Sequence, residues 1–378
     1  MAKTISLDSR STVIAAVWFT VVGASAFLIL PLLVGAAAMD FQLDESELGF
    51  LSGIGMAGSA ISAIAAIFWV RRINWRVVMF LAMLVVAAGH CFAILTSDYS
   101  QLLLAIFVVS LGGGTAYSLA LTILSDNEAP DRVFGFSVAA QVSFQVLGLL
   151  TLPALIEKGG LDALLAILGA LAVLSLIVVW FLPVAGKEVR QTHVFQIFSQ
   201  PKVVYALFGC LFFFFNVGCF WTFIERMGDA AGYSPQVIGN SLAAGVSTGV
   251  IGSLCASRFG DKYGRLRPLL LSSLGTVVAA LLLVSSDALV IYVLAIALYN
   301  FVWNYSLAYQ YAVVAAVDES GRSVAIAPAF HAFGAAIGPA LAGVLATGGG
   351  FLVINIMVAV SVMISFALFV PACKVNEV

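Results

Sequence analysis

Residues 257–267 read SRFGDKYGRLR, a short charged run with a long apolar run on each side. The flanking runs, 236–258 and 268–286, are close to the ~20 residues that an α-helix needs to cross a hydrocarbon core of ~30 Å. The whole chain has this character, because 62% of its 378 residues are hydrophobic and 10% are charged. A soluble domain is about 45–50% apolar and about 25% charged. The sequence therefore predicts an all-α polytopic membrane protein.

The composition also excludes several functional classes. A net charge of −2 does not suit a protein that binds nucleic acid, so we expect no nucleic-acid partner. The five cysteines are odd in number and show no C-x-x-C spacing, which indicates packing residues rather than disulfides or a metal site. No predicted loop is long enough for a soluble catalytic domain. We therefore expect no enzyme activity, no cofactor and no metal.

Charged residues and Gly or Pro breaks divide the apolar sequence into segments of membrane-spanning length. The first segment is too long for the ~7–15-residue core of a cleaved signal peptide, so we interpret it as a retained helix. The segments are also too long and continuous for the ~10-residue strands of a membrane barrel. The sequence predicts twelve spans, at 12–38, 48–70, 77–96, 101–124, 133–156, 161–183, 202–224, 236–258, 268–286, 289–316, 323–346 and 350–372.

The basic residues predict the orientation of these spans. With the N-terminus inside, fifteen of the 17 Lys and Arg residues fall on the cytoplasmic side, and only Lys158 and Arg226 fall outside. Cytoplasmic loops of membrane proteins carry this excess of positive charge. We therefore expect a monomeric multi-pass protein of the cytoplasmic (inner) membrane, in contact with lipid and with both termini cytoplasmic.

The chain is also predicted to consist of two similar halves. The longest internal loop separates an N-terminal six-helix bundle (1–183) from a C-terminal one (202–378), with a cytoplasmic linker at 184–201. When the sequence is displaced by 186 positions, part of the fifth span matches the eleventh. The matching residues are Ser137, Val138, Phe144, Gly148, Pro153, Ala154 and Leu155 with Ser323, Val324, Phe330, Gly334, Pro339, Ala340 and Leu341. Two similar lobes suit a transporter that exposes a central site alternately to each side.

The charged run at 257–267 resembles the signature of the major facilitator superfamily, G-x-x-x-D-R/K-x-G-R-R/K. Ser257 stands at the first glycine and Leu266 departs from the last basic position. Gly264 suits a tight turn with positive φ. The resemblance implies secondary transport by two pseudo-symmetric six-helix bundles and a gating role for the matching residues Asp261, Lys262, Gly264 and Arg265.

The first half departs from this signature. Its corresponding loop has Arg71 where the acid is expected and Asn74 in place of glycine. Asp126, at the inner end of the fourth span, is a candidate gating partner of Arg132, and the alternative is an exposed loop acid. The fourth span has no arginine and the fifth lacks the antiporter signature, which argues against multidrug/proton antiport of the usual type.

The resemblance implies that the first, fourth, seventh and tenth spans line the central cavity. In the tenth, Asn300 and Asn304 lie one turn apart, as do Tyr299 and Trp303. Amides at membrane depth need partners, which favours either contact with substrate or hydrogen bonds between helices. The candidate substrate-binding residues are Tyr117, Gln141, Gln145, Asn216, Trp221, Tyr299, Asn300, Trp303 and Asn304.

Two residues are candidates for proton coupling. His331 lies in the middle of the eleventh span, and imidazole titrates near neutral pH; the alternative is a histidine hydrogen-bonded between helices. Glu225 lies near the outer end of the seventh span, and the alternative there is an interfacial ion pair with Arg226.

These observations predict a secondary transporter that moves a small neutral, aromatic or amphiphilic organic solute, with protons as the coupling ion and export slightly favoured. Two alternatives stay open. One is proton-coupled uptake of an organic acid or a sugar-like solute. The other is a membrane sensor that uses the same scaffold without transporting anything.

Overall fold

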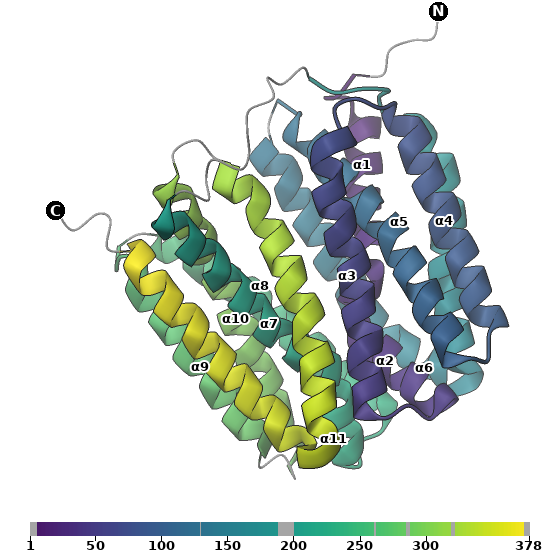
Figure 1. Ribbon diagram of the computed structural model, residues 1–378. Helices are drawn as coiled ribbons and strands as arrows, with labels where there is room; N and C mark the ends of the chain where they lie inside the picture. The colour runs from purple at the N-terminus through teal and green to yellow at the C-terminus, as the bar shows by residue number, and fades with distance from the viewer. Residues whose placement is uncertain are drawn as a thin grey trace, which may run out of the picture. The chain divides into compact units, whose positions relative to one another are not determined.

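The computed structural model describes residues 6–128, 130–187, 200–260, 262–284, 288–318 and 322–373, and every regular element among them is helical. The elements, labelled in Figure 1, are α1 (Arg10–Leu28), α2 (Leu30–Phe41), α3 (Glu45–Trp69), α4 (Trp75–Leu95), α5 (Tyr99–Ser125), α6 (Pro130–Val178), the short 3₁₀ helix η1 (Val179–Phe181), α7 (Pro201–Ala230), α8 (Pro235–Phe259), α9 (Leu266–Val284), α10 (Leu289–Val317) and α11 (Arg322–Cys373).

Ten helices in the described ranges are long and apolar enough to cross a membrane. Two of them, α6 and α11, are each interrupted by a glycine with non-helical backbone angles. Gly160 has φ 59° and Gly350 has φ 62°. Glycine reaches positive φ without the steric cost of a Cβ atom, so each glycine lets the chain turn between two helical segments. The helices are therefore consistent with the twelve predicted spans.

The first predicted span is not one continuous helix. The chain breaks at Ile29, between α1 and α2, where the backbone angles are φ −110° and ψ 21°. Pro31 follows in the first turn of α2. A proline has no N–H to donate to the carbonyl four residues earlier, and its ring clashes with that carbonyl. The prediction of a single helix over 12–38 was therefore wrong at this point.

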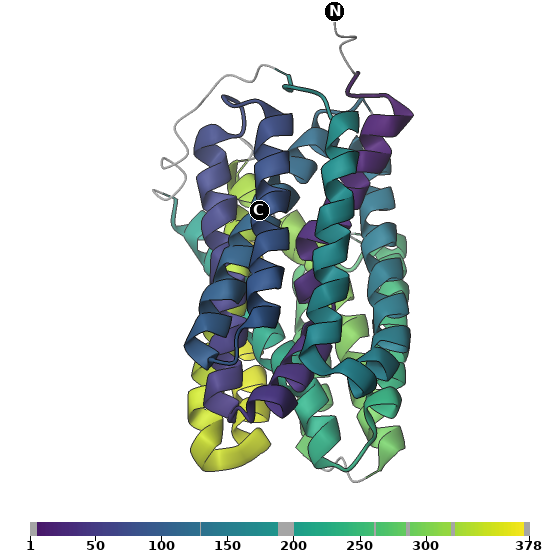
Figure 2. The ribbon, with the colours of Figure 1, turned by 90° about the vertical axis from the view of Figure 1, so that its right-hand side faces the viewer.

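The helices form two compact units. The first comprises Met1–Gln42 and Ile54–Gln191, and the second comprises Leu43–Gly53 and Thr192–Val378. In the first unit α1 and α4 each pack against α5 and α6, and in the second α7 packs along α11 and α8 along α10. Figures 1 and 2 show the helices of each unit running side by side. The predicted linker at 184–201 stays a prediction, since 188–199 lie outside the described residues.

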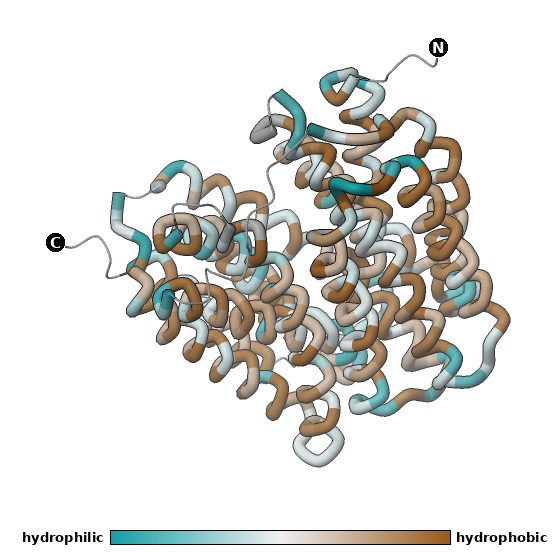
Figure 3. The backbone as a smooth tube through the Cα atoms, turned by 45° about the horizontal axis from the view of Figure 1, so that its top comes forward, coloured by the Kyte–Doolittle hydropathy of each residue, from teal (hydrophilic) through white to brown (hydrophobic). Residues whose placement is uncertain are grey.

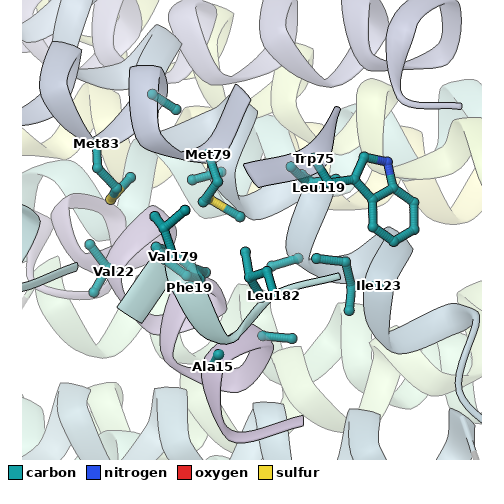
Figure 4. Close-up of a cluster of buried hydrophobic side chains, with 14 of the residues drawn as sticks. Ala15, Phe19, Val22, Trp75, Met79, Met83, Leu119, Ile123, Val179 and Leu182 are labelled. Carbon is teal, nitrogen blue, oxygen red and sulfur yellow. The ribbon is translucent and has the colours of Figure 1, made fainter. Parts of the chain in front are cut away.

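A hydrophobic core holds the first unit together (Figure 4). Phe19, Met79 and Met83 are fully buried in it. Burial of one such side chain contributes about 1.5–3 kcal/mol where the alternative is exposure to water. The labelled core residues come from α1, α4, α5 and the chain around η1, and are Ala15, Phe19, Val22, Trp75, Met79, Met83, Leu119, Ile123, Val179 and Leu182.

The exposed faces of the helices are also hydrophobic. Val173, Leu174 and Ile177 on α6 are more than half exposed, and Leu95 at the end of α4 is 79% exposed. Figure 3 shows hydrophobic residues along the helices and hydrophilic residues gathered mainly at their ends. Apolar surface of this extent is unfavourable in water and suits contact with lipid.

Candidate functional site

An aromatic cluster joins α7 to α10 in the second unit. The rings of Phe220 and Tyr299 stack face to face, with centroids 3.5 Å apart and an interplanar angle of 1°. The Tyr299 hydroxyl donates a hydrogen bond to Asn216 Oδ1 at 2.6 Å, and Asn216 Nδ2 donates to the Phe213 carbonyl. Asn216 and Tyr299 are each 1% exposed. Two predicted substrate-binding residues therefore bond to each other, which is the interhelical arrangement considered as the alternative.

Two tryptophans extend this cluster. Trp303 makes edge-on contacts with Trp221, at 6.2 Å between ring centroids, and with Tyr299, at 6.3 Å. Trp221 is fully buried. The indole Nε1 of Trp303 is buried and has no hydrogen-bond partner among the described residues. An indole N–H in the interior of a protein usually finds an acceptor. Trp303 of α10 therefore has an N–H donor without an acceptor among the described residues, next to the rings of Trp221 and Tyr299.

His331, from α11, joins the same cluster through Phe214. Phe214 stacks on the imidazole, with 4.0 Å between centroids and an interplanar angle of 19°, and meets the Trp303 ring edge-on at 6.3 Å. The Tyr311 hydroxyl lies 3.4 Å from His331 Nδ1. His331 Nε2 is buried, with no partner in the described part of the chain. The structure therefore brings a candidate coupling residue, His331, and a candidate binding residue, Trp303, into contact with the same phenylalanine.

Sequence reasoning missed Phe214. It is one of four consecutive phenylalanines, residues 212–215, which look alike as part of an apolar span. Only the turn of α7 shows which of the four rings meets His331.

The two asparagines of α10 bond within their own helix. Asn300 Nδ2 donates to the Ile296 carbonyl and Asn304 Nδ2 donates to the Asn300 carbonyl, each at 3.0 Å. A Cβ atom on Gly249 of α8 would collide with the Asn304 amide. Both amides therefore have polar partners already, and Asn304 lies against α8.

Glu225 is a buried carboxyl in α7. It is 7% exposed, and its Oε2 atom has no hydrogen-bond partner within the described ranges. Arg226 Nη1 instead donates to Asp229 Oδ2 at 2.8 Å, in a partly exposed pair. The Tyr292 hydroxyl donates to the neighbouring Ile224 carbonyl at 2.8 Å. Arg226 thus has Asp229 as its ion-pair partner, and Glu225 Oε2 has no hydrogen-bond partner among the described residues.

The polar candidates of the first unit all have hydrogen-bond partners. Tyr117 and Gln141 bond through their side chains, and Gln141 Nε2 also donates to Ser137 Oγ at 3.1 Å. Gln145 Nε2 donates to the Leu28 carbonyl at 2.9 Å. That carbonyl lies at the break between α1 and α2, where the helical hydrogen-bond pattern stops. Gln145 therefore supports the break, since a buried unpaired carbonyl is unfavourable.

Asp126 is the centre of a charged cluster in the first unit. Its carboxylate accepts hydrogen bonds from Arg71 Nη1 at 2.5 Å and Nη2 at 2.9 Å, and from the Lys187 backbone N–H at 2.9 Å. Arg71 also donates to the Lys187 carbonyl at 3.2 Å. Asp126 is only 5% exposed, so it is not an exposed loop acid. The predicted pairing with Arg132 stays a prediction, because that side chain lies outside the description.

The first residues of α4 also hold the chain that follows η1. The Trp75 backbone N–H donates to the Val184 carbonyl at 2.8 Å, and Arg76 Nε donates to the Leu182 carbonyl at 2.6 Å. A Cβ atom at Gly186 would collide with both the Trp75 ring and the Asp126 carboxylate. We call these contacts, together with the Arg71–Asp126 pair, the Asp126 clamp. Arg71, which departs from the family signature, supplies its cation.

The corresponding loop of the second half is partly described. Gly264 has φ 67°, so the predicted turn with positive φ is confirmed. Lys262 Nζ lies 5.4 Å from the centroid of the Tyr263 ring, and the Arg265 carbonyl accepts a hydrogen bond from the Leu269 N–H at 3.3 Å. Asp261 lies outside the described residues.

Comparison with known proteins agrees with the family resemblance. The family model for the Major Facilitator Superfamily matches residues 15–215 and 206–375. No curated protein sequence matches the chain.

Several solved structures share the fold. A bacterial homologue of the human lysosomal transporter Spinster has a TM-score of 0.70 and 16% identity, over 96% of this chain and 95% of that one. The nucleoside transporter NupG has a TM-score of 0.81 and 12% identity, over 97% and 100%. A D-xylose–proton symporter has a TM-score of 0.77 and 14% identity, over 96% and 98%. The chain is therefore a multi-pass membrane protein with the all-α transporter fold, and it belongs to the Major Facilitator Superfamily.

Proposed function

We propose that the chain is a secondary active transporter that moves a small neutral, aromatic or amphiphilic organic solute across the cytoplasmic membrane by alternating access. The observation that carries this proposal is the aromatic cluster of α7, α10 and α11, with its unused ring nitrogens on Trp303 and His331. Family membership supplies the class of activity.

The composition of the cluster favours an uncharged solute. Its rings offer flat apolar surfaces, and contacts between aromatic rings are worth about 0.5–1.5 kcal/mol beyond the area they bury. We assign direct contact with the solute to Trp221, Tyr299 and Trp303. We assign a structural role to the amides of Asn216, Asn300 and Asn304 in the second unit, because each already has a hydrogen-bond partner. We assign the same role within the first unit to the side chains of Tyr117, Gln141 and Gln145, which also have partners.

We propose protons as the coupling ion, with Glu225 and His331 as the groups that carry them. Each is a buried titratable side chain with an atom that lacks a hydrogen-bond partner in the described structure. Ionisable groups at membrane depth are costly and are typical of proton pathways. A change of charge at such a site alters the relative free energies of two conformations.

The arrangement in the membrane follows from the basic residues. The excess of Lys and Arg in the loops assigned to the inside supports cytoplasmic termini in the inner membrane. The exposed apolar faces support direct contact with lipid, and we propose a monomer as the transporting form. In this orientation Glu225 lies toward the outer end of α7. The gating elements are the Asp126 clamp in the first half and the loop containing Asp261, Lys262, Gly264 and Arg265 in the second.

A flux assay in proteoliposomes tests this proposal. The purified chain is reconstituted and offered a panel of neutral aromatic compounds, aromatic acids, sugars and cationic drugs. We expect saturable flux of at least one neutral aromatic compound, in the export direction when the pH gradient is set as in cells. Saturable binding of a compound without flux of any kind would refute transport and favour the sensor alternative.

A second arm of the assay tests the coupling residues. Glu225→Gln and His331→Gln remove the titratable group and keep a polar side chain of similar size, and Glu157→Gln, at an exposed acid of α6, is the matched control. We expect each of the first two to abolish accumulation driven by the pH gradient, and the control to keep it. Full accumulation in both variants would show that the coupling residues are wrongly assigned.

A further inference from the structure

Two ring nitrogens without a partner in the described structure belong to side chains that both contact Phe214. Trp303 Nε1 and His331 Nε2 are both buried, and neither has a hydrogen-bond partner among the described residues. Their rings belong to different helices, α10 and α11, and Phe214 of α7 touches both, at 6.3 Å and 4.0 Å between centroids. A buried N–H without an acceptor costs about 1–3 kcal/mol. Two such groups at one aromatic ring suggest a site that is satisfied by a ligand.

The chemistry of the two nitrogens decides whether the ligand must supply a hydrogen-bond donor or an acceptor. An indole Nε1 is only a donor. The Tyr311 hydroxyl lies 3.4 Å from His331 Nδ1, and when the hydroxyl donates to this nitrogen the proton of the neutral imidazole resides on Nε2. The imidazolium also carries a proton on Nε2. Both nitrogens then donate, so the ligand must accept.

The charge of the ligand follows from the rings around it. Phe214, Tyr311, Trp221 and Tyr299, which contact His331 or Trp303, carry no formal charge. A carboxylate buried among such rings would need a cation to compensate for its lost hydration. A carbonyl oxygen is a good acceptor and has no such requirement.

We propose that Trp303 and His331 together determine specificity, by donating hydrogen bonds to the carbonyl oxygen of a planar, uncharged aromatic solute whose ring packs beside Phe214. This inference rests on the proposed transport function and narrows its substrate class. His331 then contacts the solute directly, in addition to its proposed part in coupling.

Binding of benzamide to the purified full-length chain tests this inference, measured by saturation-transfer NMR titration. Benzoate serves as the anionic probe of similar shape, and benzylamine as the cationic probe without an acceptor. We expect saturable binding of benzamide, and binding of the other two probes at least tenfold weaker. Equal or tighter binding of benzoate or benzylamine, or no binding of any probe, would overturn the proposal.

Variants then locate the site. Trp303→Phe and His331→Phe keep an aromatic ring and remove the N–H group, and each is expected to weaken benzamide binding about two- to tenfold, the usual worth of one net hydrogen bond. His331→Gln restores an N–H donor and should weaken binding less than His331→Phe. Trp180→Phe, at a tryptophan that is 63% exposed, is the control and should bind like the native chain.

The outcome separates this inference from the proposed function. If Trp303→Phe and His331→Phe bind benzamide like the native chain, the two-donor site is wrong, even though flux in proteoliposomes persists. If the native chain shows no flux of any solute, the proposed transport function is wrong, even if benzamide binds as expected.

Discussion

Replacement of Asp126 by asparagine is predicted to release the segment that follows η1. The Asp126 carboxylate accepts two hydrogen bonds from Arg71 and one from the Lys187 backbone N–H. An asparagine keeps one oxygen, but it loses the charge and places an N–H₂ group where a second acceptor stood. Arg71 would therefore lose one of its two hydrogen bonds to residue 126. The Lys187 N–H would either lose its acceptor or share the single remaining oxygen with Arg71.

The size of the effect follows from the burial of the two partners. Removal of one member of a fully buried ion pair costs about 3–5 kcal/mol, because the other charge remains buried and unpaired. The Asp126 side chain is 6% exposed, but the Arg71 side chain is 25% exposed and can regain part of its hydration. We therefore expect about 2–3 kcal/mol, which corresponds to a roughly 30- to 160-fold change in the local opening equilibrium.

Hydrogen exchange of the Lys187 amide measures this opening directly, since a local opening equilibrium sets the exchange rate of a protected amide. In Asp126→Asn we expect the exchange of the Lys187 amide to accelerate roughly 30- to 160-fold. Arg71→Lys should give an intermediate value, because lysine keeps the charge and loses the two-pronged geometry.

Asp229→Asn is the matched control for the loss of one negative charge. Asp229 belongs to an exposed pair, with 48% of its side chain accessible. Such pairs are worth about 0.2–1 kcal/mol. We expect no change in Lys187 exchange in this variant. Unchanged exchange in Asp126→Asn as well would refute the clamp.

Two further predictions concern the second unit. Tyr299→Phe removes the donor to Asn216 Oδ1 and leaves a buried acceptor unpaired, so thermal unfolding in detergent should show a loss of about 1–3 kcal/mol, and an unchanged midpoint would contradict the bond. Gly338→Ala places a Cβ atom against the Phe215 carbonyl where α7 and α11 pack, and should destabilise the chain by about 1–3 kcal/mol. At Gly348, where an added Cβ meets nothing within 4 Å, the same substitution should be neutral or stabilising by up to about 1 kcal/mol, and equal effects at the two positions would rule out the close packing.

The sequence predicted most of the fold because the membrane imposes a simple constraint on it. Each helix must hydrogen-bond its own backbone N–H and C=O groups across the hydrocarbon layer, so the length of an apolar run is enough to locate a span. The break at Ile29 was missed, although Pro31 is visible in the sequence, since a proline in the first turn of a helix and one in a continuous helix give the same apolar run. The turn at Gly160 falls between two predicted spans, and the turn at Gly350 falls at the first residue of the twelfth predicted span.

The site was less predictable, because its contacts depend on how helices face one another. The pairing of Arg71 with Asp126 joins residues 55 positions apart, and the loop sequence showed only that the expected acid was missing. The amides of Asn216 and Gln145 signal a need for partners, but whether those partners are solute or backbone depends on the packing of α7 and on the α1–α2 break. Spacing along one helix did find the shared face of Tyr299 and Trp303.

Concentrative uptake of a labelled neutral aromatic solute into proteoliposomes tests the central proposal most directly. The relevant proteoliposomes have the cytoplasmic face of the protein outward and an acidic lumen, so that export corresponds to movement into the lumen. They should accumulate the solute above its external concentration, and a protonophore should abolish the accumulation. Glu225→Gln should equilibrate the solute without concentrating it. Accumulation that survives the protonophore would contradict proton coupling, and the absence of any protein-dependent flux across the whole solute panel would contradict transport itself.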